Sequence, residues 1–143
     1  MPPSRLFTIG YEGRTPEEYL GLLLGAGVTL LCDVRANPFS RKRGFSKRAL
    51  AEACAAAGLR YEHLPELGIA KEQRRSVLTR ADRDALFATY ARESLPKQGA
   101  ALDQLRAWLA AGERVALTCY ERDPTACHRS HVAAALGGGG EAL

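Results

Sequence analysis

The side chains best suited to chemistry gather near the end of the chain. Cys119 and Glu121 follow an apolar run, and the segment Cys127-His128-Arg129-Ser130 comes shortly after them. A cysteine can act as a nucleophile, while a nearby histidine or carboxylate moves protons. This region therefore predicts a site in which Cys127 or Cys119 would attack a substrate, with His128 or Glu121 as the proton-transfer group.

The same segment also favours the binding of an anion. We expect Cys127-His128-Arg129-Ser130 to open a helix that is capped by Asp123 or Thr125, with Pro124 in its first turn. Free backbone amides there attract anions, Arg129 and Ser130 would contact the ligand, and a thiol in this setting is partly thiolate. The alternative is that Cys127 packs in the core and that His128 bonds to a strand end.

Further polar residues follow the other predicted strands. Tyr11 comes after the strand at Leu6–Ile9, Asp33 and Arg35 come after the strand at Val28–Cys32, and His63 ends a third strand. The carboxyl ends of parallel strands meet at one edge of a sheet, so these side chains are expected to converge there as ligand-binding residues. An equally weighted alternative is that Asp33 and Arg35 form a buried ion pair that fixes the loop.

The elements that position these residues alternate between strand and helix. Apolar runs predict strands at 6–9, 28–32, 59–64 and 115–119, and helical spacing of apolar residues predicts helices. Two helices are expected to start at the caps Thr15, which Pro16 follows, and Ser46. Three more helices are expected to include residues 86–91, 102–109 and 128–136. The run at 28–32 is typical of a strand buried on both faces. The pattern predicts an α/β fold: one three-layer α/β/α domain over residues 1–136, a mainly parallel sheet of about four strands, and a flexible glycine-rich tail at 137–143.

Composition and charge point to a globular protein with an anionic partner. The chain has 143 residues, is 46% hydrophobic and carries a formal net charge of +4. These values exclude wholesale disorder, and we expect a cytoplasmic protein without a signal peptide, membrane span or membrane partner. Between Val34 and Ala51 the basic residues, which include Arg41, have no acidic neighbour. This predicts a phosphate-bearing small molecule or a nucleic acid as partner.

Several familiar chemistries lack their motifs. The sequence contains neither a phosphate-binding loop of the G-x-x-x-x-G-K-[ST] type nor a G-x-G-x-x-G fingerprint, so no cofactor is assigned. A zinc site could be formed by Cys119, Cys127, His128 and His131. Their spacing is not a familiar zinc pattern, and on one helix Cys127 and His128 would not share a face. No metal ligands are therefore assigned.

The motifs together resemble a known family. They are Thr8-Ile9-Gly10-Tyr11, Asp33-Val34-Arg35, Ser40-Arg41, Phe45, the Tyr61–Gly68 segment and Cys119-x-Glu121 with Cys127-His128-Arg129-Ser130. In this order, over residues 6 to 136, they look like the domain of unknown function 488 family. The resemblance implies an α/β fold and leaves the activity open. In that family a further strand commonly follows the last helix, whereas the glycine-rich end of this chain is not expected to supply one.

The sequence therefore favours a protein that binds a phosphate-bearing ligand, a nucleotide or a nucleic acid, at the carboxyl ends of its strands. Chemistry based on cysteine and histidine would add to that binding, and whether the protein is an enzyme stays open. Two alternatives remain at this point: a non-catalytic interaction module whose polar residues brace the sheet, and a redox or metal site formed by Cys119 and Cys127.

Overall fold

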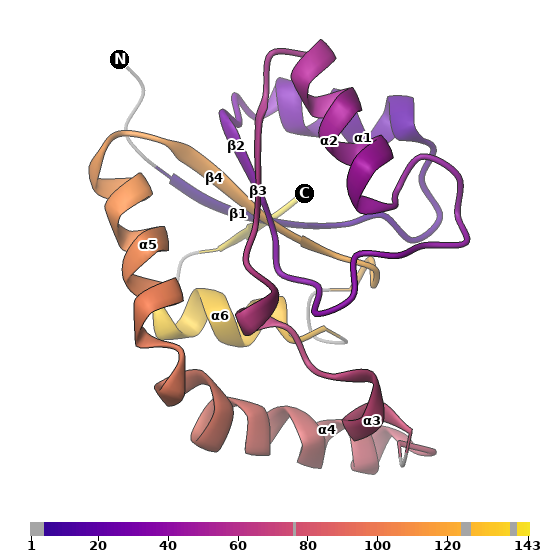
Figure 1. The fold of residues 1–143 in the computed structure, drawn as a ribbon, viewed down its shortest axis with the longest axis vertical. Coiled ribbons are helices and arrows are strands. Elements are labelled where there is room, and N and C mark those ends of the chain that lie inside the picture. Colours follow the sequence, from indigo (N-terminus) through magenta and orange to yellow (C-terminus); the bar gives the residue numbers. More distant parts are fainter. Residues whose placement is uncertain (1–4, 76, 124–126, 138–139) are drawn as a thin grey trace.

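The protein has three layers, with a central sheet between two groups of helices (Figure 1). The computed structural model describes residues 5–75, 77–123, 127–137 and 140–143. Five parallel strands form the sheet in the order β3-β2-β4-β1-β5. Their bounds are β1 (Arg5–Gly10), β2 (Leu30–Asp33), β3 (Arg60–His63), β4 (Arg114–Cys119) and β5 (Glu141–Ala142). The predicted α/β fold with a parallel sheet is confirmed.

The strand count is a correction to the sequence analysis, which expected about four strands and none from the tail. β5 lies at the edge of the sheet and pairs with β1, and the backbone amide of Leu143 donates to the carbonyl oxygen of Thr8 at 2.8 Å. Gly140 passes close to its neighbours, because a Cβ there would lie 3.0 Å from Ala133 and 3.2 Å from Thr8. A strand of two residues is too short to leave an alternating pattern in the sequence.

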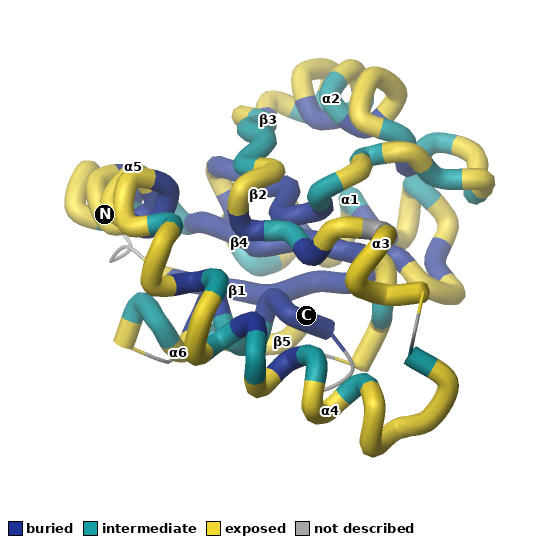
Figure 2. The backbone as a smooth tube through the Cα atoms, turned by 60° about the horizontal axis from the view of Figure 1, so that its bottom comes forward, coloured by how far each residue is buried: buried dark blue, intermediate teal, exposed yellow. Residues whose placement is uncertain are grey.

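The helices divide between the two faces of the sheet, as Figure 1 shows. One face is covered by α1 (Pro16–Gly25) and α2 (Lys47–Ala56). The other side holds α4 (Arg80–Thr89), the π-helical turn η2 (Tyr90–Ser94), η3 (Leu95–Lys97), α5 (Gly99–Ala110) and α6 (Arg129–Ala135), while η1 (Pro65–Leu67) and α3 (Lys71–Arg74) follow β3. The strands β1, β2 and β4 are buried along most of their length, whereas the helices have exposed outer faces (Figure 2).

Local sequence explains where two of the helices begin. The Thr15 hydroxyl accepts a hydrogen bond from the backbone amide of Glu18 at 3.1 Å, which confirms the predicted cap of α1. Thr79 and Asp82 form a capping box at the start of α4. Ser46 precedes α2 as predicted, but its side chain caps no helical amide and instead bonds to the backbone of Ser40. It therefore fixes the preceding basic loop.

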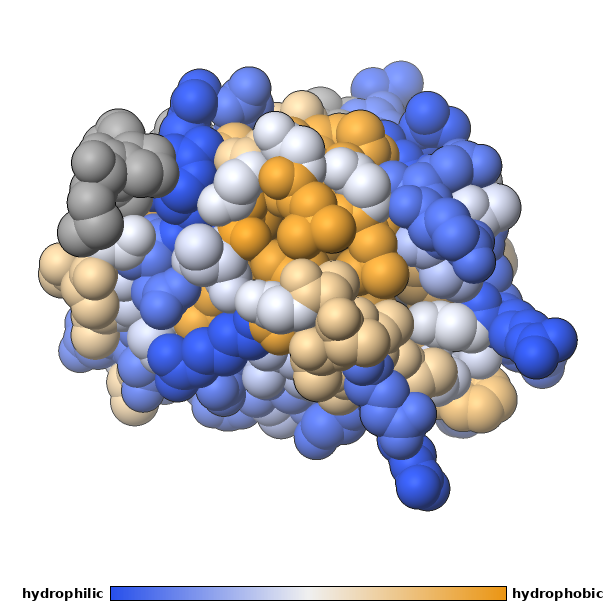
Figure 3. Space-filling model, turned by 90° about the horizontal axis from the view of Figure 1, so that it is seen from above, coloured by the Kyte–Doolittle hydropathy of each residue, from blue (hydrophilic) through white to orange (hydrophobic). Residues whose placement is uncertain are grey.

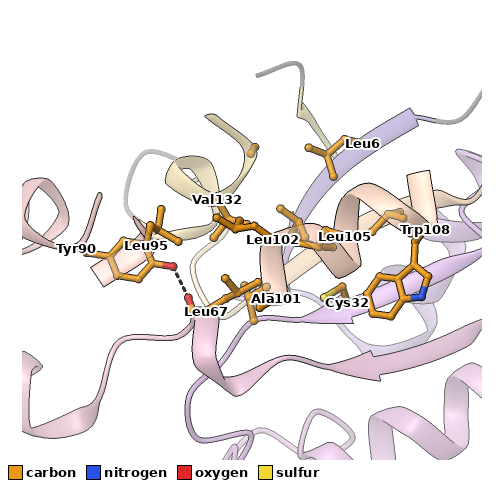
Figure 4. Close-up of a cluster of buried hydrophobic side chains, with 14 of the residues drawn as sticks. Leu6, Cys32, Leu67, Tyr90, Leu95, Ala101, Leu102, Leu105, Trp108 and Val132 are labelled. Atoms are coloured by element: carbon orange, nitrogen blue, oxygen red, sulfur yellow. Dashed lines mark hydrogen bonds between the residues drawn. The ribbon is translucent and has the colours of Figure 1, made fainter. Parts of the chain in front are cut away.

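The core on the α5 side joins elements that are distant in sequence (Figure 4). Leu102, Leu105 and Trp108 of α5 belong to the same buried cluster as Cys32 of β2. The Tyr90 hydroxyl donates to the carbonyl oxygen of Leu67 and so ties η2 to η1. This contact anchors the irregular arm after β3, which carries α3 towards the strand ends.

The outer surface mixes apolar and charged areas. Seen from the side of α1 and α2, hydrophobic side chains gather in the middle of the face and hydrophilic ones lie around them (Figure 3). Leu22 and Leu24 of α1 are among the large hydrophobic residues that remain exposed. None of the helices in the described ranges has the length and apolar character that a membrane crossing requires.

Candidate functional site

The topology leaves a crevice where the chain leaves β4. β1 and β2 lead to α1 and α2 on one face, whereas β4, which lies between them, leads to α6 on the other face. Loops that diverge in this way open a ligand crevice at the carboxyl ends of the strands. A cavity of about 520 Å³ lies there, lined by Tyr11, Arg35, Ala36, Asn37, Phe39, Ser40, Arg41, Lys42, Ile69, Arg74, Cys119, Tyr120 and Glu121.

Asp33 and Arg35 form a buried ion pair at the end of β2. Arg35 donates from Nε to Oδ1 of Asp33 at 2.8 Å and from Nη2 to Oδ2 at 2.6 Å. Its Nη1 donates to the carbonyl oxygen of Phe45 at 2.6 Å and to the hydroxyl of Tyr11 at 3.3 Å. Burial by itself lowers the pKa of Arg35, but the hydrogen bonds and charge of Asp33 outweigh it and raise that pKa above its ordinary value. The guanidinium is therefore a fixed cation at the cavity wall.

Three further side chains hold the carboxylate and the loop after β2. The Tyr61 hydroxyl donates to Oδ2 of Asp33 at 2.6 Å. Nε2 of His63 lies 2.7 Å from the carbonyl oxygen of Arg35, and Nε2 of His128 lies 2.8 Å from that of Val34. Because a carbonyl oxygen can only accept, each imidazole donates from Nε2. The loop is thus braced from β3 on one side and from the segment before α6 on the other.

Two glycines allow the loops around the cavity to approach each other. A Cβ on Gly10 would lie 1.8 Å from the carbonyl oxygen of Glu121, and one on Gly68 would lie 2.1 Å from the backbone nitrogen of Ala36. Both distances are far below any real contact, and the opposing atoms are backbone. Glycine is therefore required at both positions for the strand ends to close around the site.

A smaller cavity of about 190 Å³ adjoins the first. It shares Arg74 and Glu121 with the larger cavity, and its other lining residues are Val77, Arg83, Leu86, Phe87, Cys127 and His128. Arg41, Lys42, Arg74 and Arg83 make no ion pair with any residue in the described ranges. The two cavities together therefore present four cations that form no ion pair with a carboxylate of the described residues.

The two cysteines of the site lie side by side between these cavities. The Sγ atoms of Cys119 and Cys127 are within covalent bonding distance, as in a disulfide. Nδ1 of His128 is 3.6 Å from the sulfur of Cys127, and Oε2 of Glu121 is 3.7 Å from the sulfur of Cys119. Burial lowers the pKa of His128 to about 4, and the charges of Arg74 and Arg129 act in the same direction. His128 is therefore neutral at pH 7.

Arg129 points into the protein rather than into a cavity. Its side chain is 1% exposed and donates to the carbonyl oxygen of Glu121 at 2.5 Å, to that of Arg122 at 3.1 Å and to the sulfur of Cys119 at 3.0 Å. Burial lowers its pKa, and the charge of Glu121 opposes that effect. Arg129 thus holds the loop after β4 in place.

Comparison with models of protein families shows to which family the chain belongs. The model of a domain of unknown function, DUF488, matches residues 15–136. The chain belongs to the DUF488 family. No curated protein and no solved structure matches it. The family name carries no activity, so a function for this DUF488 protein has to be argued from its own site.

The start of α6 in this DUF488 protein corrects one sequence expectation. The helix begins at Arg129 with His128 as its N-cap, so a cap at Asp123 is wrong; Pro124 and Thr125 lie outside the described residues. Cys127 and His128 precede the helix, and the argument that two successive helical residues cannot face one ligand does not apply to them. The Ser130 hydroxyl donates to the carbonyl oxygen of Cys127 at 3.1 Å.

The predicted site residues divide between the cavities and their supports. Tyr11, Arg35, Arg41, Cys119 and Glu121 line the larger cavity, and Cys127 and His128 line the smaller one. Asp33, His63, Arg129 and Ser130 are in neither lining and contact residues that are. The sequence analysis did not assign Phe39, Arg74, Arg83 and Tyr120, although the basic residues between 71 and 83 were a visible signal for two of them.

Proposed function

We propose that the protein binds a phosphate-bearing ligand, a nucleotide that is free or part of a nucleic acid, in the cavity at the carboxyl ends of the strands. One observation carries the proposal: Arg41, Lys42 and Arg74 line a single cavity and have no ion-pair partner among the described residues. Unpaired cations around a concave site favour a ligand that brings the opposite charge.

The size and the aromatic residues of the cavity favour a nucleotide over a bare phosphate ion. Its volume of about 520 Å³ falls in the range of small-molecule sites, roughly 300–1,000 Å³. Phe39 and Tyr120 line it and remain 68% and 46% exposed. Exposed aromatic rings beside cations bind nucleotides by stacking on the base while the cations hold the phosphate.

Two groups with catalytic potential line the same cavity. The sulfur of Cys119 lies 3.7 Å from a carboxylate oxygen of Glu121. This arrangement pairs a nucleophile with a proton acceptor. Turnover of a bound nucleotide would need Cys119 as a free thiol. Comparing turnover by the reduced chain and by a Cys119→Ser variant tests this step separately from binding.

Binding is tested by fluorescence anisotropy with a labelled mononucleotide and a short labelled single strand. Arg74→Ala and Lys42→Ala should each raise the dissociation constant about tenfold or more, as expected for the loss of a charged hydrogen bond. Arg92→Ala is the matched control, because Arg92 is exposed, faces Glu93 and lies outside both linings. The relative affinity for the two probes tells a free nucleotide from a nucleic acid.

Salt dependence provides a second, independent comparison within the basic loop. Arg41 lines the cavity and Arg43 does not, although both are exposed and differ by only two positions. Arg41→Glu should reduce the salt slope of binding to the single strand by about one, the value of one phosphate contact, and Arg43→Glu should change it less. If neither probe binds the native chain, the proposal fails and the polar residues only brace the sheet.

A further inference from the structure

Three atoms that commonly bind metal ions meet between the two cavities. The two Sγ atoms of Cys119 and Cys127 and a ring nitrogen of His128 lie within 4.8 Å of one another, and all three residues are buried. Cys119 lines the larger cavity, and the other two line the smaller one. The group thus lies at the point where both cavities meet the end of β4.

The imidazole of His128 is oriented as a metal ligand would be. Its Nε2 donates to the carbonyl oxygen of Val34 at 2.8 Å, which leaves the lone pair on Nδ1. That Nδ1 lies 3.6 Å from the sulfur of Cys127. Metal-binding histidines usually donate their second ring nitrogen to a carbonyl or carboxylate in this way, which fixes both the tautomer and the ring orientation. The edge contact with Tyr90, with ring centroids 5.5 Å apart, holds the ring further.

The separation between Cys127 and His128 matches that between two ligands of one tetrahedral ion. Zinc lies about 2.3 Å from sulfur and about 2.0 Å from nitrogen, so two such ligands are about 3.5 Å apart; the observed separation between sulfur and Nδ1 is 3.6 Å. The Cα atoms of Cys119 and Cys127 are 7.3 Å apart, whereas disulfides usually span about 4.4–6.8 Å. The backbone therefore suits two thiolates that turn towards a shared ion.

Charge at the site favours sulfur in its thiolate form. Arg129 is 1% exposed, forms no ion pair with a described carboxylate, and donates to the sulfur of Cys119 at 3.0 Å. Negative charge nearby stabilises a buried guanidinium, and a thiolate at Cys119 would add to the charge of Glu121. The thiolate is also the form of cysteine that binds metals.

We propose that Cys119, Cys127 and His128 bind one thiophilic divalent ion, with Zn²⁺ as the best match to two sulfurs and one imidazole. Three protein ligands leave the fourth tetrahedral position for a water molecule or a ligand in the adjoining cavities, which is the arrangement of catalytic rather than structural zinc sites. This proposal does not depend on nucleotide binding, because the three ligands hold the ion by themselves.

The test uses the full chain, reduced and freed of metal. Titration with Zn²⁺ in competition with a coloured chelator should give one equivalent of tight binding. Co²⁺ in place of Zn²⁺ should give the strong visible bands of a tetrahedral ion and a near-ultraviolet band from thiolate-to-cobalt charge transfer. The cobalt spectrum reports the ligands of the native chain directly, so it remains informative even if a variant fails to fold.

Variants then identify the ligands. Cys119→Ser, Cys127→Ser and His128→Gln should each weaken Zn²⁺ binding about 100-fold or more, since even the partners that orient a ligand contribute 10- to 100-fold. Cys54→Ser is the control, because Cys54 is a buried free cysteine in the core on the opposite face of the sheet. This variant should bind Zn²⁺ as tightly as the native chain does. A reduced native chain that fails to take Zn²⁺ from the chelator, or a cobalt complex without sulfur ligation, would overturn the proposal. The pair would then be a redox disulfide.

Discussion

Nη1 of Arg129 donates a hydrogen bond to the sulfur of Cys119 over a distance of 3.0 Å. The remaining hydrogen bonds of this buried guanidinium go to backbone carbonyl oxygens. Among its hydrogen-bond partners in the described part of the chain, only the sulfur can therefore become an anion. The sequence suggested that Arg129 would contact a ligand beside a partly ionised Cys127, whereas the structure brings the cation to Cys119 at the end of β4.

This contact predicts how the thiols differ in reactivity. In the reduced, metal-free chain at pH 7, iodoacetamide should label Cys119 faster than Cys54, because a guanidinium favours the thiolate while burial raises the pKa of Cys54 to about 11. Mass spectrometry of peptides at increasing times measures both rates. If Cys119 and Cys54 are labelled at equal rates, and only when the protein unfolds, then Cys119 is an unreactive residue of the core.

Removing the carboxylate of Asp33 should strongly destabilise the fold. Asp33→Ala leaves the charge of Arg35 buried without its partner, which costs about 3–5 kcal/mol. Glu52→Ala is the matched change in an exposed pair with Arg48 and should alter the free energy of unfolding by less than about 1 kcal/mol. Urea denaturation of both variants measures the difference. A small effect of Asp33→Ala would mean that Arg35 finds another partner.

The glycines at the strand ends give a test of the close loop packing. Gly10→Ala and Gly68→Ala place a methyl group against backbone and should each cost about 1–3 kcal/mol or more. Gly21→Ala lies in α1, where a Cβ meets nothing within 4 Å, and should instead stabilise the protein by about 0.4–1 kcal/mol. Thermal unfolding should therefore shift in opposite directions. A rise in melting temperature for Gly10→Ala would contradict the loop positions.

Stability of the metal-free protein should fall in mild acid because of His128. Burial lowers its pKa to about 4, while an unfolded histidine titrates near 6.5. Below pH 6.5 the unfolded chain binds a proton that the folded one does not, so this contribution is complete above pH 6.5 and is lost towards pH 4. The loss is on the order of 3 kcal/mol. In His128→Gln, the urea midpoint should therefore change less between pH 4 and pH 7 than it does in the native chain. An unchanged pH dependence would show that other groups cause the loss of stability.

The fold was largely predictable because its signals are local. The apolar run around β2 predicted a buried parallel strand, and Thr15 with Pro16 marked the start of α1, as observed. β5 was missed because two residues carry no periodicity and are held by pairing with β1. The cap of α6 was misplaced at Asp123 because residues 127 and 128 are as compatible with a helix as with the turn that precedes it, whereas the N-cap is His128.

The site residues that directly follow a strand could be predicted from the sequence. Tyr11, Arg35 and Glu121 line the cavity because they follow β1, β2 and β4. Arg74 reaches the same cavity from the arm after β3, and the anchor of that arm is a contact between residues far apart in sequence. The inward direction of Arg129 depends on where α6 begins, so its type and position alone did not reveal it.

The central claim is that the cavity at the strand ends binds a nucleotide, and one NMR titration tests it most directly. Amide spectra of the ¹⁵N-labelled chain are recorded while a nucleoside monophosphate is added. The predicted result is saturable shifts confined to Tyr11, residues 35–42, Ile69, Arg74 and the segment 119–121, all of which line the cavity or lie between lining residues. Shifts centred on another face, or no shifts at saturating ligand, would contradict the account.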